Sequence, residues 1–448
     1  MLRIKFEDKK AKLILFLIIL LFLVLCFISF WIHGNETLLG SFEKMDNDDV
    51  KYLRSAWTLL ATGEYTYNNP NMPTVFIMPG LTTVLAAFVR LFGTYPLLPF
   101  KIFQSLLGAM SLYILFLISR KFFTEKASLF SVFLAAIYFP NIYATNLILT
   151  EQIFSFLFIL LVLITYHGVT EKRMIYYILG GITLGLLALF RPTILLFPIV
   201  VLALWIINKY KMKEMIKYAL IVITITCAIL SPWIIRNYWI FGEFIPLTLS
   251  SGNPFLQGTF INYNQQDAAA SVPYYHALIR EEGIIDIDSF GKSELVNNEV
   301  ETWIGKYRIK NVMTKEPLKY IYWYTIGKTI KNWSLPFIWI NLFNIGNYGG
   351  FIIAGLQHCL YIFLFIFAII TLRKNREVTS MHWLLLLSLL YFNVAHLPFY
   401  CFARYMYPVM PLLIIFSGYG VSELLAAINS KKNKALMEED KGAVAYTS

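Results

Sequence analysis

Long runs of apolar residues alternate along the chain with short polar segments. The first run, residues 13–32, reads LILFLIILLFLVLCFISFWI and follows three lysines, Lys9, Lys10 and Lys12. About 20 residues at roughly 1.5 Å per residue span the hydrocarbon core of a bilayer, so this run predicts a transmembrane helix. The run is longer than the apolar part of a signal peptide and no small-residue cleavage site follows it, so we interpret it as a retained membrane anchor.

Comparable apolar segments recur along the rest of the chain. They predict about ten transmembrane helices in all, and hence an all-α integral membrane protein. The further spans are expected at residues 98–119, 128–146, 152–169, 175–190, 192–208, 217–235, 351–372, 381–399 and 405–425.

The charges between these spans indicate their orientation. If the N-terminus is cytoplasmic, every loop that must share its side carries a basic cluster, as the positive-inside rule requires. These clusters are Arg120/Lys121/Lys126, Lys172/Arg173, Lys209/Lys211/Lys213/Lys217, Arg373/Lys374/Arg376 and Lys431/Lys432/Lys434.

This orientation divides the chain into alternating segments. We expect a cytoplasmic N-terminus (1–12), a first transmembrane helix (13–32), a first extracytoplasmic loop with juxtamembrane helices (33–97), transmembrane helices 2–7 (98–235), a long extracytoplasmic or interfacial loop (236–350), transmembrane helices 8–10 (351–425) and a cytoplasmic tail (426–448).

Two apolar segments do not fit this pattern as spans. Residues 76–93 are short and contain a proline, a glycine and an arginine, and a span here would invert the side of every later basic loop. We therefore expect an interfacial helix in this segment. Residues 317–345 carry two lysines inside an aromatic run, and we expect this segment to be interfacial or re-entrant. Between them, residues 290–313 have the character of an amphipathic helix.

The composition is that of a membrane protein. The 448 residues are 58% hydrophobic and only 15% charged, against about 25% charged in soluble proteins. The net charge of +11 follows from the basic loops and is weak evidence for nucleic acid, which we do not expect as a partner. The four cysteines stand singly and the six histidines lack ligand spacing, which argues against a disulfide framework and a transition-metal site.

An acidic cluster follows the first span. Residues 45–67, MDNDDVKYLRSAWTLLATGEYTY, predict an amphipathic helix. At about 100° per residue, Asp49 lies at the border of its apolar face and Asp48 turns toward solvent. One interpretation is that Asp46, Asn47 or Asp48 caps this helix and that Asp49 favours its dipole. The other is that Asp49 takes part in chemistry.

A second carboxylate, Glu151, stands at the start of the fourth predicted span, on the same side of the membrane as Asp49. It is either a first-turn acid that favours the helix dipole, or one half of an acid/base pair or cation site with Asp49.

Three arginines, Arg191, Arg236 and Arg404, fall at the same membrane edge, where the positive-inside rule predicts none. They either extend to lipid headgroups or bind a phosphate, for which the planar guanidinium group is suited. Carboxylates and arginines together at headgroup level indicate that the substrate is a phosphate carried on a lipid.

Residues 49–93 resemble the first external loop of C-type glycosyltransferases (GT-C fold), in the family of bacterial relatives of protein O-mannosyltransferases and lipid A aminoarabinose transferase. The pattern there is D-x-x-Y, a small residue and Leu, G-x-Y, and then Pro and a PG pair. It is matched by Asp49, Tyr52, Ala56, Leu59, Gly63, Tyr65, Pro73, Pro79 and Gly80. Later motifs are similar in the same order, so that the resemblance covers roughly residues 35–425: TE at Thr150-Glu151, RPT at 191–193, PWIIRNYWIFGEFIPLT at 232–248 and RYMYPVMPLL at 404–413.

The resemblance implies an inverting glycosyltransferase of the plasma membrane with its active site on the extracytoplasmic face. It would move a sugar from a polyprenyl (undecaprenyl-type) phosphate donor to a cell-envelope glycan, lipid or protein. It would do so by direct displacement, with the lipid tail left among the membrane lipids.

The resemblance also implies roles for single residues. Asp49 corresponds to the catalytic base and Glu151 to a second active-site carboxylate. The donor-phosphate ligands would be Arg404 and Arg236, with Arg191, and the supporting residues Asp48, Tyr52 and Tyr405. Many relatives have an acidic pair at the first two motif positions, whereas the pair here is Asp48-Asp49; the spacing to Tyr52 favours Asp49 as the base, and Asp48 stays open. A divalent cation, Mg²⁺ or Mn²⁺, between Asp49 and Glu151 is compatible with the pattern, and no organic cofactor is expected.

Two other function classes compete with this interpretation. A flippase or transporter of lipid-linked saccharide should show repeated halves and broken helices at the membrane centre. The sequence has no such repeat, and the candidate residues lie at a membrane edge. An O-antigen ligase or polymerase relies chiefly on a large external loop late in the chain, so the early Asp49 motif argues against it.

Overall fold

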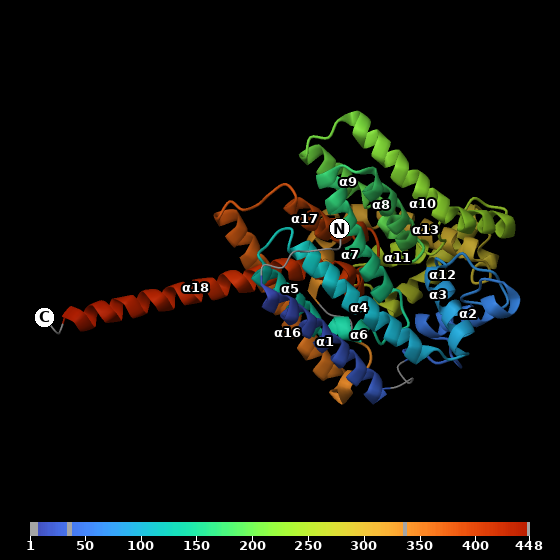
Figure 1. Cartoon of the computed structure of the whole chain (residues 1–448). Coiled ribbons are helices and arrows are strands. Elements are labelled where there is room, and N and C mark those ends of the chain that lie inside the picture. Colours follow the sequence, from blue (N-terminus) through green and yellow to red (C-terminus); the bar gives the residue numbers. More distant parts are fainter. Residues whose placement is uncertain (1–7, 34–37, 335–337, 446–448) are drawn as a thin grey trace.

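The computed structural model describes residues 8–33, 38–334 and 338–445 (Figure 1). Four expected segments extend beyond the described residues, at residues 1–7 of the N-terminal segment, 34–37 of the first loop, 335–337 of the segment 317–345, and 446–448 of the tail. The described residues fold into helices without a strand, and an isolated bridge joins Thr66 to Pro73. The predicted all-α membrane fold is confirmed.

Long apolar helices form the body of the molecule. Six are long and apolar enough to cross a membrane, and the last of them begins with the 3₁₀ turn η6 (Ala403–Val409). The chain is therefore a multi-pass membrane protein. The six are α1 (Lys9–His33), α4 (Leu97–Ser119), α7 (Glu151–Glu171), α10 (Met212–Phe241), α16 (Gly346–Lys374) and α18 (Met410–Ala445).

Three other predicted spans are helices, but shorter than the roughly 20 residues that cross the hydrocarbon core. They are α8 (Met174–Ala188), the 3₁₀ turn η1 (Pro192–Leu196) with α9 (Pro198–Ile207), and α17 (His382–His396). The segment 76–93, expected as an interfacial helix, contains α3 (Gly80–Phe92), whose 13 residues are likewise short.

The predicted span 128–146 is wrong as a single helix. It is divided between α5 (Glu125–Ile137) and the six-residue α6 (Phe139–Ala144), with Tyr138 in an extended conformation between them. Pro140 explains the break, because it has no N–H to donate to the preceding turn and is tolerated only in the first turn of a new helix. An irregular segment then leads to α7, so Glu151 is the first residue of a helix rather than a residue inside a continuous one.

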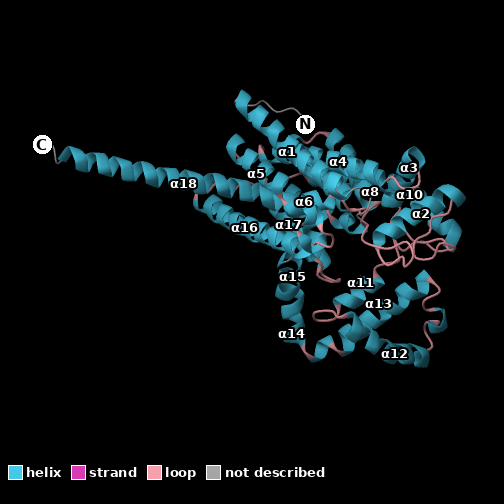
Figure 2. Cartoon of the chain, turned by 90° about the horizontal axis from the view of Figure 1, so that it is seen from below, coloured by secondary structure: helices cyan, strands magenta, loops and turns pink. Residues whose placement is uncertain are grey.

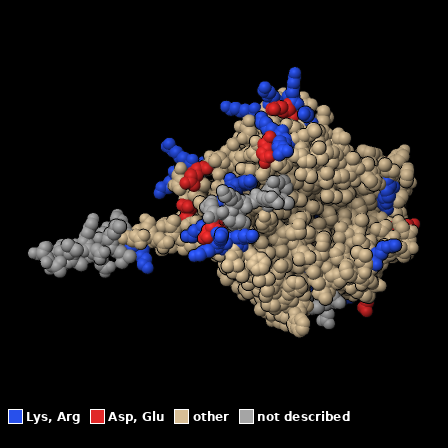
Figure 3. Space-filling view, viewed as in Figure 1, with Lys and Arg blue, Asp and Glu red and all other residues tan. Residues whose placement is uncertain are grey.

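The bundle has two different ends. Consecutive helices joined by short connections run in opposite directions, so the basic loops α4–α5, α7–α8, α9–α10 and α16–α17 gather at one end. The opposite end, which we call the site end, carries the start of α7 and the turn η6. Figure 3 shows a broad uncharged surface with charged side chains along its edges. Many large apolar side chains on α1, α10 and α16 are exposed there, as on a lipid-facing surface.

Helix α2 (Asp48–Thr62) lies at the site end together with α3. The Asn47 side chain caps α2 by accepting a hydrogen bond from the Asp48 N–H, and α2 ends at Gly63, whose φ of 77° suits glycine. The apolar faces of α2 and α3 pack on each other around Leu53, Ala56 and Leu85, which are buried. The N-terminus of α2, with its two aspartates, is thereby fixed at the site end.

A separate group of helices lies below the bundle in Figure 2. Its own small core contains Tyr275, Ile279, Val300 and Ile304. The group consists of α11 (Gly252–Gly258), α12 (Gln265–Glu282), η2 (Ile287–Ser289), α13 (Glu294–Asn311), η3 (Met313–Lys315) and α14 (Pro317–Tyr322). We call it the helical appendage; the amphipathic helix expected over 290–313 is its α13.

Two contacts tie the helical appendage to the site end. Glu294 accepts hydrogen bonds from Thr74 Oγ1 (2.7 Å) and the Val75 N–H (2.9 Å), and the Tyr400 N–H donates to the Pro254 carbonyl (2.7 Å). The chain returns to the bundle through a π-helical turn η4 (Trp323–Gly327), α15 (Lys328–Ser334) and the turn η5 (Leu342–Asn344). The segment 317–345 is thus a series of short helical pieces in its described part.

Gly80 joins the α2–α3 layer to the bundle at a close approach. Its N–H donates to the Leu189 carbonyl (2.8 Å), and a Cβ at this position would lie 2.5 Å from that oxygen. We expect Gly80→Ala to destabilise the protein by about 1–3 kcal/mol, because neither backbone can move freely. The measurement is the thermal unfolding temperature of the detergent-solubilised protein.

Gly355→Ala in α16 is the matched control, because nothing lies within 4 Å of its added Cβ. The close approach would be unimportant if both variants unfolded at the same temperature as the unsubstituted protein.

Candidate active site

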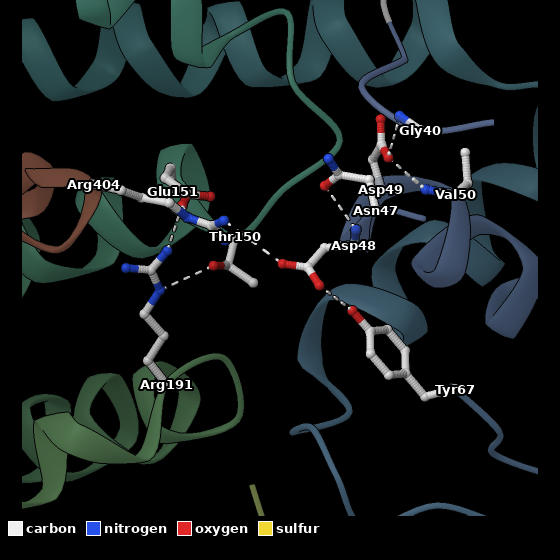
Figure 4. Close-up of polar contacts among 10 residues, drawn as sticks. All are labelled: Gly40, Asn47, Asp48, Asp49, Val50, Tyr67, Thr150, Glu151, Arg191 and Arg404. Atoms are coloured by element: carbon white, nitrogen blue, oxygen red, sulfur yellow. Dashed lines mark hydrogen bonds and ion pairs between the residues drawn. The ribbon is translucent and has the colours of Figure 1, made fainter. Parts of the chain in front are cut away.

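Four segments bring charged side chains together at the site end of the bundle. Asp48 comes from the first residue of α2, Thr150 and Glu151 from the start of α7, Arg191 from the residue before η1, and Arg404 from η6 (Figure 4). Each side chain stands at a helix end or in a tight turn, where the backbone is held by the bundle.

Glu151 is the centre of this cluster. Its side chain is only 1% exposed, and its Oε1 atom accepts hydrogen bonds from Arg404 Nε and from Arg191 Nη2, the latter at 2.7 Å. Arg191 Nε also donates to Thr150 Oγ1 at 3.0 Å. The Oε2 atom of Glu151 is buried and has no hydrogen-bond partner among the described residues. One carboxylate thus holds two guanidinium groups side by side, with one acceptor atom still unused.

Asp48 faces this pair from α2. Its Oδ2 atom lies 3.6 Å from Arg404 Nη1, and its Oδ1 atom accepts a hydrogen bond from the Tyr67 hydroxyl at 2.7 Å. Burial, and then the neighbouring Asp48 charge, raise the pKa of Tyr67 well above its ordinary value, so the phenol stays protonated and donates. The Asp48 side chain is 45% exposed and therefore accessible to a substrate. Of the three residues considered as the cap of α2, Asn47 is the one observed, and Asp48 contacts Arg404 and Tyr67 as well as solvent.

Asp49 points away from the cluster. Its buried carboxylate accepts three backbone hydrogen bonds, from the N–H groups of Leu39 (2.5 Å), Gly40 (3.2 Å) and Val50 (2.8 Å). Burial raises the pKa of Asp49, while the three N–H groups act in the opposite direction. The Asp49 carboxylate therefore holds the segment that leads into α2, and the structure does not bring it together with Glu151.

Arg236 also lies outside the cluster. Helix α10 continues to Phe241, beyond the predicted span, so Arg236 is in its last turns. Its Nη1 atom donates to the Thr74 carbonyl (2.7 Å) and its Nη2 atom to the Tyr65 carbonyl (3.2 Å). The guanidinium group therefore holds the loop between α2 and α3, rather than lying beside Arg404.

The two predicted supporting tyrosines lie close to the cluster. The Tyr52 ring is buried beside the Tyr67 ring, with their centroids 5.3 Å apart. The Tyr405 ring stacks on His396, with centroids 4.9 Å apart. Both rings support residues of the cluster or its walls, and neither forms a hydrogen bond with Asp48 or Glu151 in the described part of the chain.

A cavity of about 440 Å³ opens beside Arg404. Its walls are partly apolar and partly polar. The centroid of the Trp339 ring lies 5.6 Å from the Arg404 guanidinium carbon. The lining residues are Leu38, Leu39, Asn47, Trp339, Ile340, Phe402 and Arg404. A reacting group in this cavity would meet Arg404 on one side and the N-terminus of α2 on the other.

Tyr67 and Trp339 were not among the residues expected at the site. Tyr67 lies two residues after Tyr65 of the G-x-Y motif, in the extended segment of the Thr66–Pro73 bridge. That short bridge returns the chain toward Asp48, and no periodicity in the sequence indicates it. Trp339 comes from a segment whose place is set by long-range contacts, such as the Tyr143 hydroxyl bonded by the N–H groups of residues 339 and 340.

The residues do not fit a divalent cation between Asp49 and Glu151. The Asp49 oxygens are occupied by backbone N–H groups, and Glu151 is bound by two arginines, whose positive charges oppose a cation. No group of three or more His, Cys, Asp or Glu placed to hold a metal ion occurs within the described ranges.

Comparisons with known proteins agree with this architecture. The family model described as dolichyl-phosphate-mannose-protein mannosyltransferase matches residues 76–235, from the segment of α3 to α10. No curated protein sequence matches the chain. The family match confirms the resemblance found in the motifs over the residues that it covers.

Solved structures match nearly the whole chain. The archaeal oligosaccharyltransferase AglB from Archaeoglobus fulgidus is 15% identical with a TM-score of 0.56, over 96% of this chain and 52% of AglB. A second structure of this enzyme, in the apo form, is 16% identical with a TM-score of 0.56 and the same coverage. ArnT from Cupriavidus metallidurans is 14% identical with a TM-score of 0.43, over 90% of this chain and 76% of ArnT. The chain spans about half the length of the oligosaccharyltransferase that it matches, and it has the fold of the GT-C membrane enzymes.

The two aspartates of α2 should respond differently to amide substitution. We expect Asp49→Asn to loosen residues 38–50 and to cost about 1–3 kcal/mol, because an amide cannot accept all three backbone N–H groups. Hydrogen exchange of the intact protein in detergent measures this loosening.

Asp48→Asn is the matched control, since it leaves those three hydrogen bonds in place. Faster exchange of residues 38–50 in Asp48→Asn than in Asp49→Asn would contradict the structural assignment.

Proposed function

We propose that the chain is a membrane glycosyltransferase that moves a sugar from a polyprenyl phosphate sugar to an acceptor of the cell envelope. One observation carries this proposal. Glu151 holds the guanidinium groups of Arg191 and Arg404 side by side, and the accessible carboxylate of Asp48 lies next to Arg404. The hydrogen bonds of the cluster leave Arg191 Nη1 and Arg404 Nη2 without a partner among the described residues. These donors suit the oxygens of a phosphate.

The comparisons support the donor class. The matching family model carries the name of an enzyme that uses a dolichyl phosphate sugar. AglB, which shares the fold, has been crystallised in complex with an inhibitory peptide and a dolichol-phosphate. Both point to a sugar carried on a lipid phosphate.

In the proposed reaction, Asp48 is the base. The acceptor hydroxyl attacks the anomeric carbon, the bond from this carbon to the phosphate oxygen breaks, and the proton of the hydroxyl passes to Asp48. Polyprenyl phosphate leaves with the bonding electron pair. Direct displacement inverts the anomeric configuration. Asp48 is preferred to Asp49 because its carboxylate is half exposed and faces Arg404, whereas both Asp49 oxygens are bound by backbone N–H groups.

Arg404 and Arg191 stabilise the charge that develops on the leaving phosphate. Two neighbouring guanidinium groups repel each other, and the negative charge of the buried Glu151 carboxylate, which pairs with both, offsets this repulsion. Glu151 is therefore a positioning residue for the two arginines in this mechanism.

The site is inferred to face the extracytoplasmic side of the plasma membrane. The basic loops gather at the end of the bundle opposite to the site, and the positive-inside rule assigns such loops to the cytoplasm. A sugar transferred at the site end would then be added to an acceptor of the cell envelope.

The polyprenyl tail is assigned to an apolar cavity of about 610 Å³ between α7, α8, α9 and α10. Leu195 and Phe197, which line it, follow Arg191 by one turn or two, so that a phosphate at Arg191 and a tail in the cavity can belong to one molecule.

Amide substitution of the base tests the reaction. We expect Asp48→Asn to lower kcat by about 10²–10⁴-fold, because the amide cannot accept the proton of the acceptor hydroxyl. Activity is measured in membranes with labelled polyprenyl phosphate sugar. Asp46→Asn is the matched control, because this aspartate is exposed and, among the described residues, accepts a hydrogen bond only from the local Ser41 N–H. Full activity of Asp48→Asn would contradict its role as the base. Lipid translocation without sugar transfer by the unsubstituted protein would instead favour a flippase.

Filling the apolar cavity tests the assignment of the tail. Gly180 lines this cavity, and a Cβ there meets only Ile164, at 3.8 Å. We expect Gly180→Phe to raise KM for a long-chain donor at least several-fold, and to affect a short-chain donor less, because the short tail needs less of the cavity. Gly355→Phe in α16, where the added Cβ meets nothing within 4 Å, is the control. An equal effect on both donors would place the tail elsewhere.

A further inference from the structure

The helical appendage contains a pocket of its own. Its volume is about 210 Å³, and residues of α11, α12, α13 and their connections line it. Drug-sized ligands occupy pockets of about 300–1,000 Å³, so this pocket suits a smaller group, such as one sugar ring of a longer molecule. The mechanism proposed above does not use it.

The walls of this pocket combine aromatic rings with hydrogen-bonding groups. Phe260, Tyr263 and Tyr275 supply rings. Arg308, behind the pocket, fixes two of these rings, since its guanidinium carbon lies 3.5 Å from the Phe260 centroid and its Nη1 donates to the Tyr275 hydroxyl (2.9 Å). Rings held in this way present a flat apolar face to a ligand.

The polar groups of the pocket form a short chain. Gln257 Nε2 donates to Asn253 Oδ1 (2.7 Å), and Asn253 Nδ2 donates to Glu301 Oε1 (2.7 Å). The buried His276 Nε2, also in the lining, has no hydrogen-bond partner in the described part of the chain. Carboxylate, amide and imidazole groups can accept or donate hydrogen bonds to several hydroxyl groups of one ligand.

A row of aromatic rings connects this pocket with the candidate active site. The Tyr263 and Tyr400 centroids are 5.7 Å apart, those of Tyr400 and Phe402 are 6.1 Å apart, and Phe402 stacks on Trp339 at 5.6 Å. Phe402 and Trp339 line the cavity that contains Arg404. The row therefore leads from the pocket to the cavity beside Arg404, whose Nη1 atom lies 3.6 Å from Asp48 Oδ2.

We propose that the pocket and this row of rings bind an oligosaccharide acceptor, with a terminal or internal sugar in the pocket and the reacting sugar beside Asp48. This proposal rests on the proposed function, because it identifies the acceptor of that reaction as a glycan. The apolar C–H face of a sugar packs on an aromatic ring, and its hydroxyl groups reach Glu301, Asn253 and Gln257.

Charge and shape favour a neutral or amino sugar over other ligands. Glu301 is the carboxylate of the lining and no lysine or arginine belongs to it, so a phosphate or acidic sugar would be repelled. A peptide usually adds to a sheet edge or lies in a long groove. The described residues of the helical appendage contain no strand, and the pocket is short.

The test is saccharide binding to the full-length protein in lipid nanodiscs, followed by saturation-transfer NMR and calorimetry. The probes are maltotriose, chitotriose, sialyllactose and a peptide rich in serine and threonine. We expect a neutral trisaccharide to bind. We also expect Tyr263→Ala and Glu301→Gln each to weaken this binding about tenfold, the value of one lost ring or charged hydrogen-bond contact.

Matched controls lie near the substituted residues in the sequence. Tyr274→Ala alters the residue before Tyr275 outside the pocket lining, and Glu299→Gln alters an exposed glutamate one turn or less from Glu301. Both should bind the trisaccharide as the unsubstituted protein does. If Tyr263→Ala does not fold, as judged by size-exclusion chromatography, Gln257→Ala takes its place.

The outcomes separate this proposal from the proposed function. Saccharide binding and transfer of the labelled sugar are measured separately, so a failure of one is distinguishable from a failure of the other. Absence of binding by all neutral saccharides, equal binding by the pocket variants, or binding of the peptide alone would each overturn the acceptor assignment. None of these results would change the transfer activity measured with the labelled donor.

Discussion

The arrangement of the site depends on one buried carboxylate that binds two arginines. Glu151 stands at the start of α7, almost fully removed from solvent, and its Oε1 atom is shared by Arg191 and Arg404. Removing one partner of such a buried ion pair costs about 3–5 kcal/mol of stability. The carboxylate and the two arginines therefore hold one another in place. Three segments that are remote in sequence are thereby fixed at one point, and α2 adds Asp48 to them.

The same constraint separates the duties of neighbouring residues. Asp48 and Asp49 are adjacent on α2, yet one faces Arg404 and the other binds three backbone N–H groups. Arg404 joins the cluster, while Arg236 holds the loop between α2 and α3. Residues of one chemical type at one end of the bundle therefore divide into a set gathered around Glu151 and a set that holds backbone segments, and the division is made by the backbone around them.

Much of the fold could be predicted because apolar length and loop charge depend on local sequence. Glu151, Arg191 and Arg404 could be singled out because polar groups at a membrane edge need a partner, and the structure brings the three together. The spacing to Tyr52 favoured Asp49 as the base and left Asp48 open. The backbone hydrogen bonds of Asp49 could not be predicted, because they depend on where residues 39 and 40 pass. A helical wheel places Asp49 at the border of the apolar face, but it does not show that the N–H groups of residues 39 and 40 lie at this position and donate to its carboxylate. Likewise, the extension of α10 carries Arg236 away from the cluster.

We propose above that Arg191 and Arg404, held side by side by Glu151, bind the phosphate of a lipid. The most direct measurement is the affinity of the full-length protein for undecaprenyl phosphate, by native mass spectrometry in detergent, with each arginine replaced by glutamine. We expect Arg191→Gln and Arg404→Gln each to weaken binding by about tenfold or more, and Arg236→Gln to leave it unchanged once the protein is folded. A loss of binding in Arg236→Gln, with the other two variants unaffected, would contradict it.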